Sequence, residues 1–213
     1  MIELVMVIVV LGILAAMALP RYNRDIRQEA ADNIVSALRY AKHMALTDNV
    51  TNPRRNKWQR AFWRFGIEGC SDNGIFYYVT SDKDYQGDVD RTEIVNDPAN
   101  GLHLMGDNNK PCEDTTQTGS SPNIFLTFKY GIEDGNVTFS NCGSNGKYVG
   151  FDYFGRPHGG FAGASGSSYP DYSSILHSDC NITFNFSSSG IDPLSIIVEK
   201  GTGHIYIEGQ PDS

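Results

Sequence analysis

The first 20 residues constrain this chain more than any other stretch. A single acid, Glu3, precedes an apolar run that continues without a charged residue from Leu4 to Leu19. As a helix this run is roughly 24 Å long at ~1.5 Å per residue, and the two residues before Glu3 bring it near the ~30 Å of a bilayer core. A soluble domain does not leave such a helix exposed. We therefore expect residues 1–20 to lie in lipid or to pack against other copies of the same helix.

A second helical pattern follows Pro20. Hydrophobic residues recur at steps of three and four, with polar residues on the other face, at Ile26, Ala30, Ile34, Leu38, Ala41 and Ala45. This pattern predicts an amphipathic helix over residues 21–52 whose apolar stripe packs on the rest of the protein. Pro20 lacks a backbone N–H and predicts a kink, and Asn52-Pro53 predicts the end of the helix.

Residues 53–213 have the composition of one globular, loop-rich β domain. The chain has 22 glycines, and its β-branched and aromatic runs are short. Strands are predicted at 75–80, 123–130, 136–140, 148–153, 181–187, 194–199 and 204–208. The predicted fold class is α+β, with a long N-terminal α-helix, apolar in its first half and kinked near Pro20, packed on a C-terminal antiparallel β-sheet head.

The charge of the chain argues against nucleic acid as its main partner. The formal net charge is −8, and phosphate binding needs clustered Lys and Arg. Residues 54–65 are an exception, because cations there alternate with Trp58, Phe62, Trp63 and Phe65. These aromatic residues either stack on bases or anchor the start of the sheet, and we favour the second interpretation.

The four cysteines predict two disulfides. Cys70, Cys112, Cys142 and Cys180 show no C-x-x-C spacing, which disfavours a metal site. Three pairings are open, and we favour Cys70–Cys112 with Cys142–Cys180, because these bridges fasten consecutive loop regions.

Residues 82–93 (DKDYQGDVDRTE) predict a calcium loop. On the twelve-residue EF-hand pattern, Gly87 takes the turn position and ligand-type residues fall at the expected places. The alternative is an acidic, solvated hairpin tip. The predicted ligands are the side chains of Asp82, Asp84, Gln86, Asp90 and Glu93 and the backbone carbonyl of Asp88.

The N-terminal string, with its I-E-L-V start, Gly12 and A-A-M-A-L-P-R-Y, closely resembles the N-terminus of type IV pilins and type II secretion pseudopilins. The resemblance implies a signal anchor trimmed by a prepilin peptidase and N-methylated. It also implies that Glu3 meets the terminal amine of a neighbouring subunit, rather than merely lying at the headgroup boundary. Glu3 is third instead of fifth, so we expect a leader and two mature residues, Phe-Thr, before this numbering. Glu3, Gly12 and Pro20 form the predicted assembly set.

The head carries three further resemblances. The strand and acidic loop over residues 77–95 resemble a passage of GspH/FimT-type minor pilins and pseudopilins. The F-G-R-P turn from Phe154 is similar to a turn common in pilin sheets, and the T-G-H-I-Y-I ending from Thr202 is similar to the hairpin that closes many pseudopilin heads. Two acid-extended N-glycosylation motifs also occur, with Asn136 and Asn181 as candidate acceptors, and chance is a serious rival explanation for both.

These observations predict a structural subunit of a bacterial type IV pilus-like filament and no enzymatic activity. The expected partners are further copies of the chain, the inner membrane before assembly, the prepilin peptidase and the assembly machinery. The alternative is a minor pilin or pseudopilin that acts as a binding module for DNA, a surface or a secretion substrate at a filament tip.

Overall fold

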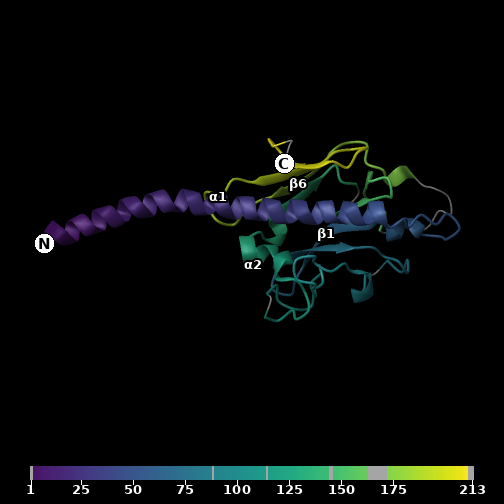
Figure 1. Cartoon of the computed structure of the whole chain (residues 1–213), viewed down its shortest axis with the longest axis horizontal. Coiled ribbons are helices and arrows are strands. Elements are labelled where there is room, and N and C mark those ends of the chain that lie inside the picture. Colours follow the sequence, from purple (N-terminus) through teal and green to yellow (C-terminus); the bar gives the residue numbers. More distant parts are fainter. Residues whose placement is uncertain (1, 88, 114, 144–145, 163–171, 211–213) are drawn as a thin grey trace.

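The computed structural model describes residues 2–87, 89–113, 115–143, 146–162 and 172–210, without the side chains of residues 2–3 and 14–25. Helix α1 (Ile2–Thr47) projects from the head at its N-terminal end and lies against the head at its C-terminal end (Figure 1). The head contains one short helix, α2 (Leu126–Tyr130), and eight strands. The strands are β1 (Trp63–Gly69), β2 (Ile75–Thr80), β3 (Val137–Ser140), β4 (Tyr148–Phe151), β5 (Pro157–His158), β6 (Cys180–Phe184), β7 (Leu194–Val198) and β8 (Ile205–Ile207).

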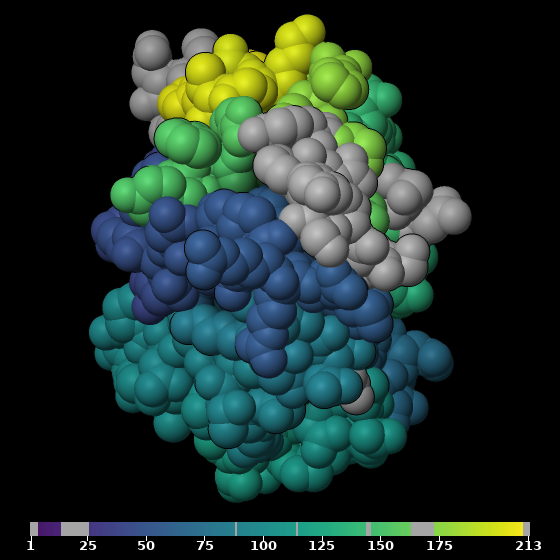
Figure 2. Space-filling model, turned by 90° about the vertical axis from the view of Figure 1, so that its right-hand side faces the viewer, coloured from purple at the N-terminus to yellow at the C-terminus, as the bar shows by residue number. Residues whose placement is uncertain are grey.

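The strands form two separate antiparallel sheets. The first has the order β2-β1-β4-β5 and the second the order β3-β6-β7-β8. Five short 3-10 helices punctuate the connections: η1 (Trp58–Ala61), η2 (Arg91–Glu93), η3 (Pro122–Ile124), η4 (Asp134–Asn136) and η5 (Tyr172–Ser174). Viewed from the end where α1 stops, the blue segment that follows α1 separates teal segments below from green and yellow segments above (Figure 2).

The predicted fold class is wrong in its description of both the sheet and the helix. The head holds two four-stranded sheets where a single β-sheet head was expected. The helical backbone also runs without interruption through Pro20, where a kink was expected. The pairing explains the first error: β1 pairs with the distant β4 and β3 with the distant β6, and local sequence patterns do not encode such pairings.

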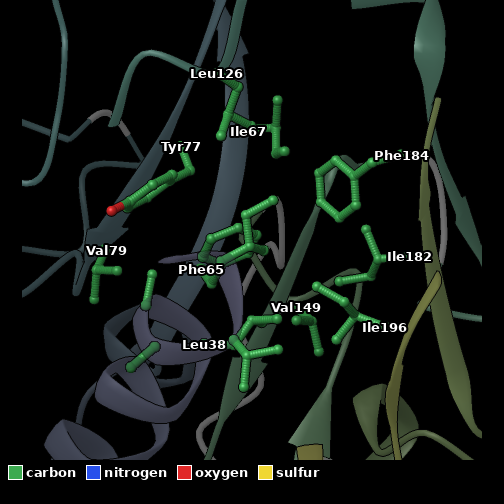
Figure 3. Close-up of a cluster of buried hydrophobic side chains, with 14 of the residues drawn as sticks. Leu38, Phe65, Ile67, Tyr77, Val79, Leu126, Val149, Ile182, Phe184 and Ile196 are labelled. Carbon is green, nitrogen blue, oxygen red and sulfur yellow. The ribbon is translucent and has the colours of Figure 1, made fainter. Parts of the chain in front are cut away.

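One core joins α1 to both sheets. The stripe predicted on α1 is confirmed from Ala30 to Ala45, where its members are at most 2% exposed. Leu38 of α1 belongs to one core with fully buried side chains of both sheets, which Figure 3 draws: Phe65, Val149, Ile182, Phe184 and Ile196. The helix is therefore the element that holds the two sheets together, because its apolar stripe contributes to the core that they share.

Helix α1 ends at Thr47, earlier than Asn52-Pro53 predicted. The Thr47 hydroxyl donates to the carbonyl oxygens of His43 and Met44 at 3.0 and 3.1 Å, and the next residue, Asp48, already turns toward the head. Its carboxylate accepts a hydrogen bond from Trp63 Nε1 at 3.2 Å and pairs with Lys83. These contacts end the helix before Pro53 is reached.

The strand predicted at residues 123–130 is also wrong, because this stretch forms the end of η3 and helix α2. Gly131 has a φ of 68°, and its N–H donates to the carbonyl oxygens of Leu126 and Thr127, which is a typical helix C-cap. The Thr127 hydroxyl accepts a hydrogen bond from the Ile75 N–H at 2.9 Å and donates to the Ile132 carbonyl. The turn thus fastens itself to the edge of β2.

Candidate functional site

The N-terminal part of α1 exposes a continuous apolar surface. We call residues 4–13 the bare segment. Its nine large hydrophobic side chains are each between 52% and 66% exposed. Because the helix projects away from the head here (Figure 1), these side chains have no partner among the described residues of the chain. Monomeric soluble proteins rarely expose an apolar patch of this kind, and such patches mark contact surfaces.

The three residues of the predicted assembly set are not brought together. Glu3 and Pro20 lie in the helical backbone, but their side chains are outside the described residues. Gly12 lies on the exposed bare segment, and a Cβ built there would meet no atom within 4 Å. Nothing within the described part of the subunit therefore requires a glycine at this position.

The membrane prediction for the same segment finds no support. Among the residues described, no helix is both long enough and apolar enough to cross a membrane.

The acidic loop, residues 82–93, leaves the end of β2 and closes on η2. Asp82, Asp84 and Glu93 each contribute a carboxylate oxygen to a group whose members all lie within 4.8 Å of one another. They occupy positions one, three and twelve of the calcium-loop pattern. Asp82 and Glu93 are buried and Asp84 is exposed, so the group has one side open to solvent.

Asp90, a further predicted ligand, does not join this group. The Asp90 carboxylate accepts hydrogen bonds from the backbone N–H and hydroxyl of Thr92, at 2.7 and 2.5 Å, and thereby caps η2. These bonds lower the pKa of Asp90. The exposed Gln86 contributes its backbone N–H to Asp84 Oδ1 at 2.9 Å. Asp88 lies outside the described residues.

The disulfides join Cys70 to Cys112 and Cys142 to Cys180, the pairing favoured from the sequence. Two disulfides are typical of proteins that fold in an oxidising compartment. Asp72 lies beside the first bridge, and its carboxylate accepts hydrogen bonds from the N–H groups of Gly74 and Cys112. Cys70, Asp72 and Cys112 lie close together, but the two sulfurs are bonded to each other. The group therefore offers no thiolate to a metal ion.

The aromatic residues of the 54–65 stretch anchor the head. Trp58, Phe62, Trp63 and Phe65 are at most 5% exposed. Phe65 lies in the main core, while Trp58 and Phe62 pack in a small second cluster with Phe161. Buried rings offer no face to a base, so the interpretation that they stack on nucleic acid is wrong.

A groove of about 750 Å³ lies between α1 and the loops that lead into α2. Its central polar group is Asn33, which donates to the Asn123 carbonyl at 2.7 Å and to the Tyr130 hydroxyl at 3.0 Å. The Tyr77 hydroxyl donates to Asn33 Oδ1 at 2.9 Å. These groups satisfy one another, so they fix the helix to the head and do not point to a ligand.

One buried polar array, centred on the F-G-R-P turn, was not predicted from the sequence. His158 contacts Ser174 Oγ through Nδ1 at 2.8 Å and Asp152 Oδ2 through Nε2 at 3.3 Å. The order is that of a Ser-His-Asp triad, but Arg156 also binds the Asp152 carboxylate, at 2.6 Å through Nη2 and 2.7 Å through Nε. His158 is only 2% exposed. The array therefore closes the turn, with the Asp152 carboxylate held by both His158 and Arg156.

The two candidate glycosylation acceptors lie in different environments. Asn136 ends η4 at a turn and donates to the Ser187 hydroxyl at 3.4 Å. Asn181 lies within β6, an inner strand of its sheet, and accepts from the Thr183 hydroxyl at 3.2 Å.

Comparison with known proteins found no matching family model, no matching curated protein and no matching solved structure.

Proposed function

We propose that this protein is a structural subunit of an extracellular, type IV pilus-like filament, and that it assembles through the N-terminal half of α1. The observation that carries the proposal is the bare segment, whose nine large hydrophobic side chains are more than half exposed on a helix that projects from the head. Burying them against neighbouring helices would contribute a gross hydrophobic term on the order of 10 kcal/mol or more, before ordering costs are subtracted.

The division of the molecule supports this assignment. The C-terminal half of α1 belongs to the core of the head, so each subunit carries its head rigidly on the helix that makes the contact. In the proposed filament the bare segments form the central bundle and the disulfide-bonded heads cover it. We include in the proposal that the precursor is held at the inner membrane, cut by a prepilin peptidase and passed to an assembly machinery.

A charge placed in the bare segment tests the proposal. We expect Ile13→Lys to abolish filaments in the sheared surface fraction of cells, because a lysine at this position is ten residues from Glu3 and would be buried in the bundle without a nearby acid on its own helix. Phe154→Lys is the matched control, since Phe154 is 73% exposed on the head. The control should still assemble. Filaments of Ile13→Lys in normal amounts would sink the proposal.

Glu3 provides a second test that rests on the sequence. An acid buried in an apolar bundle disfavours any stagger between neighbouring subunits that leaves its carboxylate without a partner. We expect Glu3→Ala to remove most filaments, measured by negative-stain microscopy, while the amount of protein in whole cells stays unchanged. Full assembly of this variant would remove Glu3 from the mechanism.

A further inference from the structure

The acidic loop concentrates charge at a place where the protein itself does not fully compensate it. Asp82 is fully buried. Its Oδ2 accepts the Gly87 N–H at 2.8 Å, whereas its buried Oδ1 has no hydrogen-bond partner. A buried carboxylate oxygen without a partner is costly, because it has lost water and gained nothing in return.

Backbone contacts hold the neighbouring carboxylates in place. Glu93 Oε1 accepts the Asp84 N–H at 3.0 Å and Oε2 accepts the Asp90 N–H at 3.3 Å. The carbonyl oxygen of Glu93 accepts hydrogen bonds from the Thr80 hydroxyl and the Ser81 N–H, so η2 is pinned to the end of β2. The three acids are thus positioned by the fold, and each carboxylate retains further lone pairs.

Neither Arg64 nor Lys83 forms a hydrogen bond with the three carboxylates. The guanidinium of Arg64 acts on Asp82 electrostatically, yet its buried Nε and Nη1 make no hydrogen bond. Lys83 is paired with Asp48 at 3.0 Å.

We propose that the acidic loop binds one Ca²⁺ ion through carboxylate oxygens of Asp82, Asp84 and Glu93. Oxygens that each lie ~2.4 Å from a common ion are at most about 4.8 Å apart, and the three carboxylates meet this limit. Ca²⁺ accepts irregular shells of oxygen ligands completed by water, which the exposed side at Asp84 can supply. Mg²⁺ demands near-ideal octahedral geometry and fits three clustered carboxylates less well.

The ion would fasten the loop to the place where α1 ends. Lys83, within the loop, pairs with Asp48 directly after the helix, and Arg60 of η1 donates to the Tyr85 carbonyl at 3.0 Å. The inference is independent of filament assembly, since it concerns the head alone.

Calorimetric titration of the full-length protein in detergent with CaCl₂, after treatment with EGTA, tests the site. We expect one Ca²⁺ per chain, a melting temperature that rises with Ca²⁺ concentration, and a weaker response to MgCl₂. Asp84→Asn removes one charge at an exposed position and keeps an acceptor for the Gln86 N–H. It should weaken Ca²⁺ binding at least about tenfold.

Glu133→Gln is the matched control, because it removes the same charge from an exposed residue outside the loop. It should bind Ca²⁺ as the wild type does. The proposal is overturned if the wild type shows neither heat nor a shift in melting temperature at millimolar CaCl₂. Equal binding by the wild type and Asp84→Asn would overturn it as well.

Discussion

The two halves of helix α1 have similar hydrophobic residues and opposite environments. Side chains of the bare segment are 52–66% exposed, whereas Ala30, Ile34, Leu38 and Ala41 are fully buried. The buried half carries polar residues on its other face, so only one of its faces packs on the head. The bare segment is apolar all round, and no single surface can cover it. The contrast shows that hydrophobicity alone does not select the partner, and that the distribution of polar residues around the helix does.

The largest effect is expected when the same substitution is made in each half of α1 and the losses of stability are compared. Leu38→Ala should lower the free energy of unfolding of the head by about 2–5 kcal/mol, because it opens a cavity between the two sheets. Leu11→Ala should change it by less than about 0.5 kcal/mol, since Leu11 is 59% exposed. Urea unfolding in detergent, followed by tryptophan fluorescence, measures both. Equal losses would show that the bare segment already packs within the subunit.

A smaller effect is expected far from the apolar stripe, at the turn closed by Asp152. Burial alone would raise the pKa of Asp152, but hydrogen bonds from His158 and Arg156 lower it to about 2. A folded-state pKa below the unfolded value of ~3.9 stabilises the head above that pH. Asp152→Asn should therefore cost about 2 kcal/mol at pH 7.

The stability lost in Asp152→Asn should depend on pH. The difference in unfolding free energy between wild type and variant should shrink as the pH falls from about 4 toward 2, because Asp152 then becomes protonated in both states. A difference independent of pH would mean that shape, and not charge, determines the loss. If the head stays folded, this variant should still form filaments, which separates stability of the head from contact through the bare segment.

The smallest effect is expected at the boundary between the two halves. Arg27 donates from Nη2 to the Pro193 carbonyl at 3.1 Å and from Nε to the Asp192 carbonyl at 3.2 Å. Arg27→Ala should cost about 0.5–1.5 kcal/mol, because these bonds are partly exposed. Hydrogen exchange should then show faster opening of the first helical turns that contact the head, with no change at Leu38. Unchanged exchange at these turns would place the boundary elsewhere.

Features carried by local periodicity were predictable from the sequence. The stripe from Ala30 to Ala45 follows from its spacing, and β2 lies at residues 75–80 as its aromatic and β-branched residues indicated. In the acidic loop, Asp82, Asp84 and Glu93 come together as the calcium-loop pattern implied. Each of these features is set by neighbours within a dozen residues.

Features that depend on competing hydrogen bonds, or on strand pairs distant in sequence, were not predictable. Asp90 is taken from the predicted ligand set because Thr92 and the start of η2 use its carboxylate. Thr127 and Gly131 convert a stretch with strand propensity into a helical turn. The division into two sheets follows from the pairs β1–β4 and β3–β6, which are distant in sequence.

The disulfides have a mechanical consequence. Cys70–Cys112 fastens the loop that borders the first sheet, and Cys142–Cys180 closes a loop at the end of the second sheet. Neither bridge crosses from one sheet to the other. Side-chain packing around Leu38 resists their separation. Hydrogen bonds from Arg39 and Lys42 of α1 to the start of β8 and the turn before it add to this resistance. If the proposed filament is put under tension, we expect the contact between the two sheets to give way before either sheet does.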